Sequence, residues 1–293
     1  MDNHVARIAV IGGSGLYQME GVAGLREVWV DTPFGKPSDA ILVGTLDDVP
    51  VAFLPRHGRG HRFAPHEINF RANIWALKSL GVKWVLSVSA VGSMKESIAP
   101  GDMVVVDQFI DRTRMRPSTF FEDGIVAHVT FSDPVCPVAR AALARACKDA
   151  DVVHHEGGAY VCIEGPQFST RAESFMHRVW DVAVVGMTNM PEARLAREAE
   201  LAYATLAMAT DYDCWHETHE EVSVAAVLAV MKDNVIKAQS VLRHAVKHLS
   251  DPALTSPTWN ALEYAIMTTP SLIPAATRER LALLISHRLG ESA

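Results

Sequence analysis

The amino-acid sequence predicts an α/β protein whose mostly parallel β-sheet is covered by helices on both faces. Short apolar runs rich in β-branched residues recur along the chain, and segments with helical spacing lie between several of them. Of the 293 residues, 49% are hydrophobic, which is enough for a large core. Strands that alternate with helices favour parallel pairing, because a crossover helix returns the chain to the same end of the sheet.

Six segments have the composition of buried strands. In chain order they are ARIAVI, VAFLP, KWVLSVSAVG, DMVVVDQFI, DVAVVGM and LAYATLAMATD. Between them, 69–80 (NFRANIWALKSL) carries Ile74 and Leu77 at helical spacing and is followed by Gly81, which can end a helix. The segment 191–202 begins with a proline that suits a first helical turn. We predict a helix at both places.

A long helix is predicted over 223–249, with Ser223 as a good N-cap. Its apolar stripe consists of Val227, Leu228, Met231, Val235, Ala238, Val241, Leu242 and Ala245. The breaker DPALTSPTW follows, and two further helices are predicted at 259–267 and 277–289.

The chain is therefore expected to consist of a main domain over 1–249 and a C-terminal helical extension over 250–293. The extension must cover its apolar side chains. It can pack on the core of its own chain or on a neighbouring subunit, and the pattern does not separate these two arrangements.

Charge and cysteine content limit the class of protein. A formal net charge of −7 and a pI near 6.0 argue against a basic surface for nucleic acid or an anionic membrane. The four cysteines lack metal-ligand spacing, and no segment reaches the roughly 18 apolar residues of a membrane span. The sequence thus indicates a soluble cytoplasmic protein that binds small molecules.

Two segments after predicted strands could bind an anion. In VIGGSGLY, glycine amides and the Ser14 hydroxyl could meet a phosphate, although an ordinary tight turn fits equally well. A dinucleotide-binding motif would need a third glycine where Gln18 stands, so a dehydrogenase is disfavoured. In PRHGRGHRF, Arg56 offers a fork of donors for an oxyanion, and a solvated basic loop is the alternative.

Two further segments could meet a flat ligand. In SVSAVGS, a strand ends among small residues that leave Ser89 and backbone amides free, as an ordinary turn would also do. In IEGPQFSTRAES, Phe168 could lie against a ring beside the hydroxyls of Ser169 and Thr170, or could belong to the core.

A pair of acids, Asp211 and Asp213, closes the last predicted strand. Because side chains alternate along a strand, the two carboxyl groups should point to the same side. They could bind a metal, cap backbone amides or recognise a substrate. The nearby HETHE places His216 and His219 three residues apart rather than four, which disfavours a zinc helix and leaves substrate recognition as the preferred interpretation.

Taken together, these segments resemble the family of purine nucleoside phosphorylases, and within it the branch that acts on 5′-methylthioadenosine. The resemblance runs from about Ile8 to Leu249 and is carried by VIGGSGL, RHGRGH, NFRANIWALK, PGDMVVVDQFIDRT, IEGPQFSTRAESF, GMTNMPEARLARE and MATDYDCW. It implies a central mixed, partly barrel-like β-sheet flanked by helices on both faces. It also implies a homo-oligomer, either a trimer or a hexamer of two trimers.

The resemblance also implies a site. The phosphate-binding residues would be Ser14, Arg56, His57, Ser89, Ala90 and Thr188. The nucleoside would meet Phe168, Ser169, Met187, Asp211, Asp213, Val224 and, from an adjacent subunit, His128. Ser14 and Ser89 stand where relatives commonly have threonine, which preserves the hydroxyl. No metal and no cofactor are expected, because inorganic phosphate is a co-substrate.

In the implied reaction, phosphate attacks ribose C1′ and the purine departs. The resemblance implies that this reaction serves purine and methionine salvage. Asp211 is the expected acid for N7 of the purine, since burial and a second carboxylate raise the pKa of an aspartate. Asp213 is expected to favour adenine by accepting its amino group. A nucleosidase that uses water instead of phosphate and a non-catalytic purine sensor are the alternatives.

Overall fold

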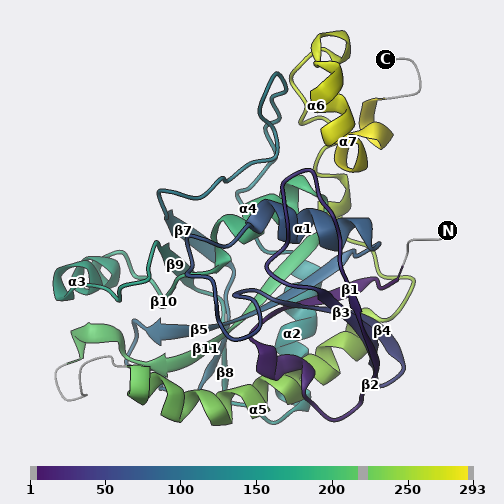
Figure 1. The fold of residues 1–293 in the computed structure, drawn as a ribbon. Helices are drawn as coiled ribbons and strands as arrows, with labels where there is room; N and C mark the ends of the chain where they lie inside the picture. The colour runs from purple at the N-terminus through teal and green to yellow at the C-terminus, as the bar shows by residue number, and fades with distance from the viewer. Residues whose placement is uncertain (1–4, 217–223, 290–293) are drawn as a thin grey trace.

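The computed structural model describes residues 5–216 and 224–289, which form an α/β fold around one mixed sheet (Figure 1). The strands within this part of the chain are β1 Ile8–Gly12, β2 Val22–Val28, β3 Ile41–Leu46, β4 Val49–Pro55, β5 Trp84–Ser93, β6 Met103–Val105, β7 Gln108–Arg112, β8 His154–Glu156, β9 Ala159–Ile163, β10 Val184–Gly186 and β11 Ala202–Asp211. The main path of the sheet runs β2-β3-β4-β1-β5-β10-β9-β7. A branch leaves this path at β5: β11 pairs with β5 and with β6, and β6 pairs with β8. The sheet stays unclosed.

The centre of the sheet is parallel, as the sequence predicted. β1 lies between β4 and β5, and β5 pairs with β11 from Trp84 opposite Ala202 onward, all in parallel. The whole sheet is nevertheless mixed, because β2, β3 and β4 form an antiparallel meander and β10 runs antiparallel to β5. The sequence did not reveal β2 as a strand because most of its residues are exposed, which removes the apolar pattern.

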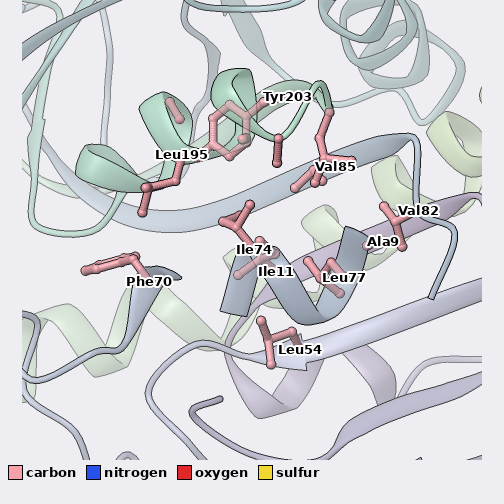
Figure 2. Close-up of a cluster of buried hydrophobic side chains, with 14 of the residues drawn as sticks. Ala9, Ile11, Leu54, Phe70, Ile74, Leu77, Val82, Val85, Leu195 and Tyr203 are labelled. Atoms are coloured by element: carbon pink, nitrogen blue, oxygen red, sulfur yellow. The ribbon is translucent and has the colours of Figure 1, made fainter. Parts of the chain in front are cut away.

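Helices cover both faces. They are α1 Phe70–Ser79, α2 Pro137–Asp149, α3 Arg171–Val179, α4 Asn189–Glu198, α5 Val224–Leu249, α6 Ala275–Arg280 and α7 Ala282–Leu289. α1 and α4 pack together on one face, while α2 and α5 pack together on the other (Figure 1). Figure 2 shows Ile74 and Leu77 of α1 against the sheet residues Ile11, Leu54 and Val85, all fully or nearly fully buried. Burial of each such side chain contributes about 2 kcal/mol.

Three predicted helices differ in their extent. α4 ends at Glu198, because Glu200 takes a left-handed conformation with φ 56° and turns the chain into β11. The segment 259–267 forms only a 3-10 turn, Pro257–Asn260, since the Glu200 carboxylate accepts the amide of Leu262 and Ile266 bridges Ala127. The helix predicted over 277–289 is two helices that meet at Leu281.

The other predicted helices agree with the structure. The Asn69 side chain caps α1 by accepting the Ala72 amide at 3.1 Å, which explains why the helix starts at Phe70. The long helix α5 runs from Val224 to Leu249. Its expected N-cap, Ser223, lies outside the described residues.

The C-terminal segment packs on the core of its own chain. Leu281, Leu284 and Ile285 are buried in the same apolar cluster as α1. Glu200 is only 2% exposed, and its carboxylate anchors the segment. It accepts the Leu262 amide at 2.9 Å, pairs with the ring of His287 at 2.6 Å and pairs with the guanidinium of Arg288 at 2.7 Å.

We predict that Glu200→Ala lowers the free energy of unfolding by about 2 kcal/mol, because it strands a buried amide and leaves Arg288 without its carboxylate. Urea unfolding followed by circular dichroism measures this change. The control is Glu263→Ala, at an exposed position in the same segment, which should shift stability by less than about 0.5 kcal/mol. Equal effects of the two substitutions would show that Glu200 anchors nothing.

Candidate functional site

A cavity of about 400 Å³ lies where several strands end. Its walls come from the turn after β1, the segment after β4, the second half of β5, the segment after β9, the β10–α4 junction, the end of β11 and one side of α5. The parallel strands β1, β4, β5 and β11 all deliver their carboxyl ends to it, which is where open α/β sheets bind ligands. This placement makes it the candidate site.

The two aspartates of the last strand both line this cavity, although strand alternation is not the reason. β11 ends at Asp211, and Asp213 begins a 3-10 turn with φ 52°. The turn folds back so that the Asp213 amide donates to Asp211 Oδ1 at 2.8 Å, while Thr210 Oγ1 donates to Asp211 Oδ2 at 2.7 Å. A Cβ placed on Gly92 would lie 3.0 Å from Asp211 Oδ1, so a residue without a side chain is needed opposite the pair.

The pKa values of both aspartates are raised above the ordinary value of 3.8. For Asp211 the cause is loss of hydration, opposed by the two hydrogen bonds that it accepts. For Asp213 loss of hydration acts first, and the negative charge of Asp211 adds to it. Asp213 is 6% exposed, and its Oδ2 has no hydrogen-bond partner within the described residues. An unpaired buried carboxyl oxygen favours a shared proton or a ligand donor.

Arg56 is the arginine of the PRHGRGHRF segment that reaches the cavity. Its guanidinium is held in a bidentate ion pair by Glu192 of α4, with Nε to Oε2 at 2.7 Å and Nη2 to Oε1 at 3.0 Å. Arg59 and Arg62 are directed instead to the buried carboxylate of Asp39, which draws them to the outer surface. Arg56 is buried, so the alternative of a solvated basic loop does not hold for it, whereas Arg59 is partly exposed and Arg62 is largely exposed.

His57 is neutral at physiological pH. Burial lowers its pKa to about 4, and the adjacent positive charge of Arg56 acts in the same direction. Its Nδ1 lies 2.8 Å from the carbonyl oxygen of Phe63, so Nδ1 carries the hydrogen and Nε2 is an acceptor. The ring stacks on His61 with centroids 4.1 Å apart, and both rings line the cavity.

Two hydroxyls complete this end of the cavity. Ser89 of β5 and Thr188 at the start of α4 both line it, as does Ala90. Ser89 Oγ donates to Asn189 Oδ1 at 3.1 Å, and Thr188 Oγ1 lies 3.4 Å from the same oxygen. Hydroxyls, glycine amides and one guanidinium are together a donor set suited to phosphate oxygens.

The other end of the cavity is flat and apolar. Phe168 is 45% exposed and lines the cavity, which excludes the alternative that it belongs to the core. Ser169 and Met187 lie in the same wall. α5 adds the side chains of Val227, Leu228, Met231 and Val235. The cavity therefore joins a polar anion-binding end, a carboxyl pair and an apolar channel.

Three predicted site residues are not placed in this cavity. His128 lines a separate cleft of about 710 Å³ with Tyr264 and Arg197, and its amide donates to the Ala265 carbonyl. In its own chain it is thus remote from the acid pair. The side chains of Ser14 and Val224 lie outside the described part of the molecule, although Gly13 and Gly15 beside Ser14 line the cavity.

Sequence reasoning missed several residues that shape the site. His61 lay inside a quoted basic segment, but its stacking on His57 depends on a left-handed turn with φ 53°. The Arg116 guanidinium donates to the carbonyls of Met187 and Met190 at 2.8 and 2.6 Å and so fixes one wall. Isolated charges in loops give no periodic signal, so no pattern could have found Arg116.

The strand order, with donors suited to phosphate at the carboxyl ends of the strands, is typical of α/β enzymes that bind small anionic ligands at this edge of the sheet. The family model described as the phosphorylase superfamily matches residues 7–247, and the chain belongs to that superfamily. It is 56% identical over 279 residues to S-methyl-5′-thioadenosine phosphorylase of Geobacter sulfurreducens, covering 95% of this chain and 97% of the relative. The corresponding protein of Thermosynechococcus vestitus is 54% identical, covering 97% and 99%.

Solved structures agree with these relatives. A crystal structure of methylthioadenosine phosphorylase from an Antarctic soil metagenomic library matches with a TM-score of 0.93 and 50% identity, over 96% of this chain and 99% of that one. Methylthioadenosine phosphorylase from Schistosoma mansoni in complex with adenine matches with a TM-score of 0.79 and 36% identity, over 96% and 98%. The fold implied by the sequence motifs is thereby confirmed.

We predict that Asp213→Asn makes stability less dependent on pH. A carboxyl group whose pKa is raised by folding adds stability below its ordinary pKa of 3.8, and that contribution is lost as pH rises through the raised value. The variant lacks this loss, so its unfolding free energy relative to that of the native chain should rise as the pH increases above the ordinary pKa of 3.8. Asparagine also tolerates the left-handed backbone at this position.

Urea unfolding at several pH values provides the measurement for Asp213→Asn. Asp151→Asn is the matched control, since Asp151 is exposed and has a similar φ of 51°. A stability difference for Asp213→Asn that stays constant with pH would contradict the raised pKa.

Proposed function

We propose that this protein cleaves 5′-methylthioadenosine with inorganic phosphate, giving adenine and 5-methylthioribose 1-phosphate. The observation that carries the proposal is one cavity that holds a phosphate-type donor set at one end and a protonatable carboxyl pair at the other. The relatives named as S-methyl-5′-thioadenosine phosphorylases, 50% identical or more over nearly the whole chain, support the same activity.

The reaction separates charge, and the cavity suits both products of that separation. As the bond from C1′ to N9 breaks, the ribose becomes cationic beside the phosphate held by Arg56, Ser89, Thr188 and backbone amides. The purine becomes anionic, and Asp211 supplies a proton to N7. Asp211 can hold that proton because loss of hydration raises its pKa. The phosphate thus stabilises the ribose cation on one side of the sugar, and Asp211 neutralises the departing purine on the other.

In this proposal Asp213 selects adenine over 6-oxo purines. An ionised Asp213 accepts the 6-amino group of adenine, whereas a 6-oxo purine would place oxygen against oxygen. Phe168 lies against the purine ring and Met187 against the ribose. Because the two acids are coupled, the proton belongs to the pair, and its location on Asp211 is the arrangement that serves catalysis.

The apolar side of α5 suits a thioether at the 5′ position. Val227, Leu228 and Met231 offer no hydrogen bond to a 5′ hydroxyl, so methylthioadenosine is preferred over adenosine. A difference of one methylthio contact in such a wall is worth about 1 to 3 kcal/mol, which makes adenosine a slower substrate. Val224 extends this wall in the proposal, and His128 enters it from a neighbouring copy.

The proposal includes a homotrimer, or a hexamer of two trimers, because His128 is remote from the cavity of its own chain. No cofactor and no metal are needed, since phosphate is the second substrate. The setting is the cytoplasm, in purine and methionine salvage. The four cysteines are all free thiols, which supports a reducing compartment. No helix in the described residues is long and apolar enough to cross a membrane.

The first test is a product assay on methylthioadenosine, adenosine and methylthioinosine with phosphate varied. Release of adenine should depend on phosphate, be fastest with methylthioadenosine and be slowest with the 6-oxo nucleoside. Chromatography of the products measures base and sugar phosphate together. Equal release without phosphate would identify a nucleosidase, and tight adenine binding without turnover would identify a purine sensor.

The second test is Asp211→Asn, which should lower kcat by about 10²- to 10³-fold because the amide cannot protonate N7. In the native enzyme kcat should fall as pH rises through the raised pKa of the pair. Changing both aspartates to asparagine should shift preference toward methylthioinosine. Asp181→Asn, which alters an exposed carboxylate paired with Lys95, is the control. Unchanged kcat in Asp211→Asn would reject the acid role.

A further inference from the structure

A buried hydrogen-bond network lies directly behind the phosphate-binding end of the cavity. Glu192 is 1% exposed, and Arg56 is 2% exposed. Besides the two bonds from Arg56, Glu192 Oε1 accepts from Ser87 Oγ at 2.8 Å and from the Tyr203 hydroxyl at 2.9 Å. Asn189 Nδ2 donates to the same tyrosine oxygen at 2.7 Å. Through Asn189 the network reaches both hydroxyls of the site.

Glu192 acts only as a hydrogen-bond acceptor in this network. Oε1 accepts from Nη2 of Arg56, from Ser87 and from Tyr203, and Oε2 accepts from Nε of Arg56. The two parallel bonds to the guanidinium are those of a bidentate ion pair. The positive charge of Arg56 is therefore balanced within the protein before any ligand binds. Glu192 also keeps Arg56 charged, because its negative charge raises the pKa of the buried guanidinium.

Most of the Arg56 fork is already used. Nε and Nη2 face Glu192 and Ser87, and Nη1 donates to the Val88 carbonyl at 3.0 Å. An arginine carries five N–H bonds, so one hydrogen on Nη1 is left for the cavity. His57 adds no positive charge, because its pKa is lowered to about 4 by burial. The described residues around the phosphate end thus carry almost no net positive charge.

We propose that Glu192 is a positioning residue that keeps the phosphate end of the cavity charge-balanced, so that bound phosphate retains its negative charge for the ribosyl cation. This inference rests on the proposed function. A free arginine would bind phosphate more tightly in the ground state but would compete with the developing ribose cation for the same charge. Binding that is stronger in the ground state than in the transition state lowers kcat.

Glu192→Gln separates charge from geometry. Glutamine keeps the length and one acceptor oxygen, and the Val88 and Ile11 carbonyls still hold the guanidinium. With the negative charge removed, KM for phosphate should fall by at least about tenfold, because at an effective dielectric constant of about 20 a unit charge even roughly 12 Å away changes binding by that factor. kcat should fall by a similar factor, and KM for methylthioadenosine should change less than about threefold.

Two variants provide controls. Glu198→Gln makes the same change on the same helix, at a buried carboxylate that accepts from the Phe120 amide and the Thr119 hydroxyl, and should leave KM for phosphate unchanged. Tyr203→Phe removes one hydrogen bond to Glu192 without changing charge, and should not tighten phosphate binding. A raised or unchanged KM for phosphate in Glu192→Gln, or equal tightening in either control, would overturn the inference.

Folding of the variant supplies an independent readout. An unpaired buried arginine is destabilising, and phosphate can replace the missing carboxylate as its counter-ion. Inorganic phosphate should therefore raise the thermal unfolding midpoint of Glu192→Gln more than that of the native protein. A variant that remains unfolded at saturating phosphate contradicts the proposal. Absence of phosphate-dependent adenine release by the native enzyme would instead overturn the proposed function.

Discussion

The parallel pairing of β5 with β11 is the constraint on which the site depends. The two strands run in register from Trp84 opposite Ala202 until a bulge places Asp211 opposite Gly92. This pairing brings Ser89 and the acid pair, far apart in sequence, to one end of the sheet. β1 on the other edge of β5 adds the glycine turn, and α5 closes the cavity from one side. A shift of one residue would send every one of these side chains to the opposite face.

The cavity manages buried charge in two different ways. At the phosphate end, the charge of Arg56 is balanced by Glu192 through a bidentate ion pair. At the purine end, no cation among the residues that the structure describes lowers the pKa of the acid pair, so loss of hydration favours protonation instead. The first arrangement gives a fixed donor that does not titrate. The second gives a group that can release and recover a proton. Both rely on the exclusion of water by the sheet and helices around them.

The sequence predicted an element correctly where burial imposes a repeating pattern of apolar residues, and it missed or misplaced an element where burial imposes no such pattern. The central strands and α1 carry continuous or helical apolar patterns, and they lie where predicted. β2 is exposed along most of its length. In the segment 259–267, where a helix was expected, the Leu262 amide donates to Glu200 and the Met267 amide to Val126, which are contacts with distant parts of the chain. Local patterns cannot contain such contacts.

For the site, too, the sequence indicated residues near strand ends but not their partners from distant segments. The motif segments pointed to Arg56, Ser89 and Asp211, and all three line the cavity. Arg56 follows β4 and Asp211 ends β11, whereas Ser89 lies within β5, which continues to Ser93 instead of ending among the small residues as expected. The partners of these residues were not identified, since Glu192 and Tyr203 meet Arg56 only after α4 and β11 pack beside β5. The relation between Asp211 and Asp213 was expected from strand alternation, but a left-handed turn at Asp213 produces it. Long-range packing, rather than spacing, determined each of these features.

The burial of 281–285 in the same apolar cluster as β1 and α1 has a consequence for biosynthesis. During translation, the first strand and first helix emerge long before the residues that cover them. Part of their apolar surface therefore stays uncovered until Leu281, Leu284 and Ile285 have left the ribosome. Closure of this half of the molecule therefore waits until α7 has been synthesised, and a chain that stops before α7 leaves part of this core uncovered.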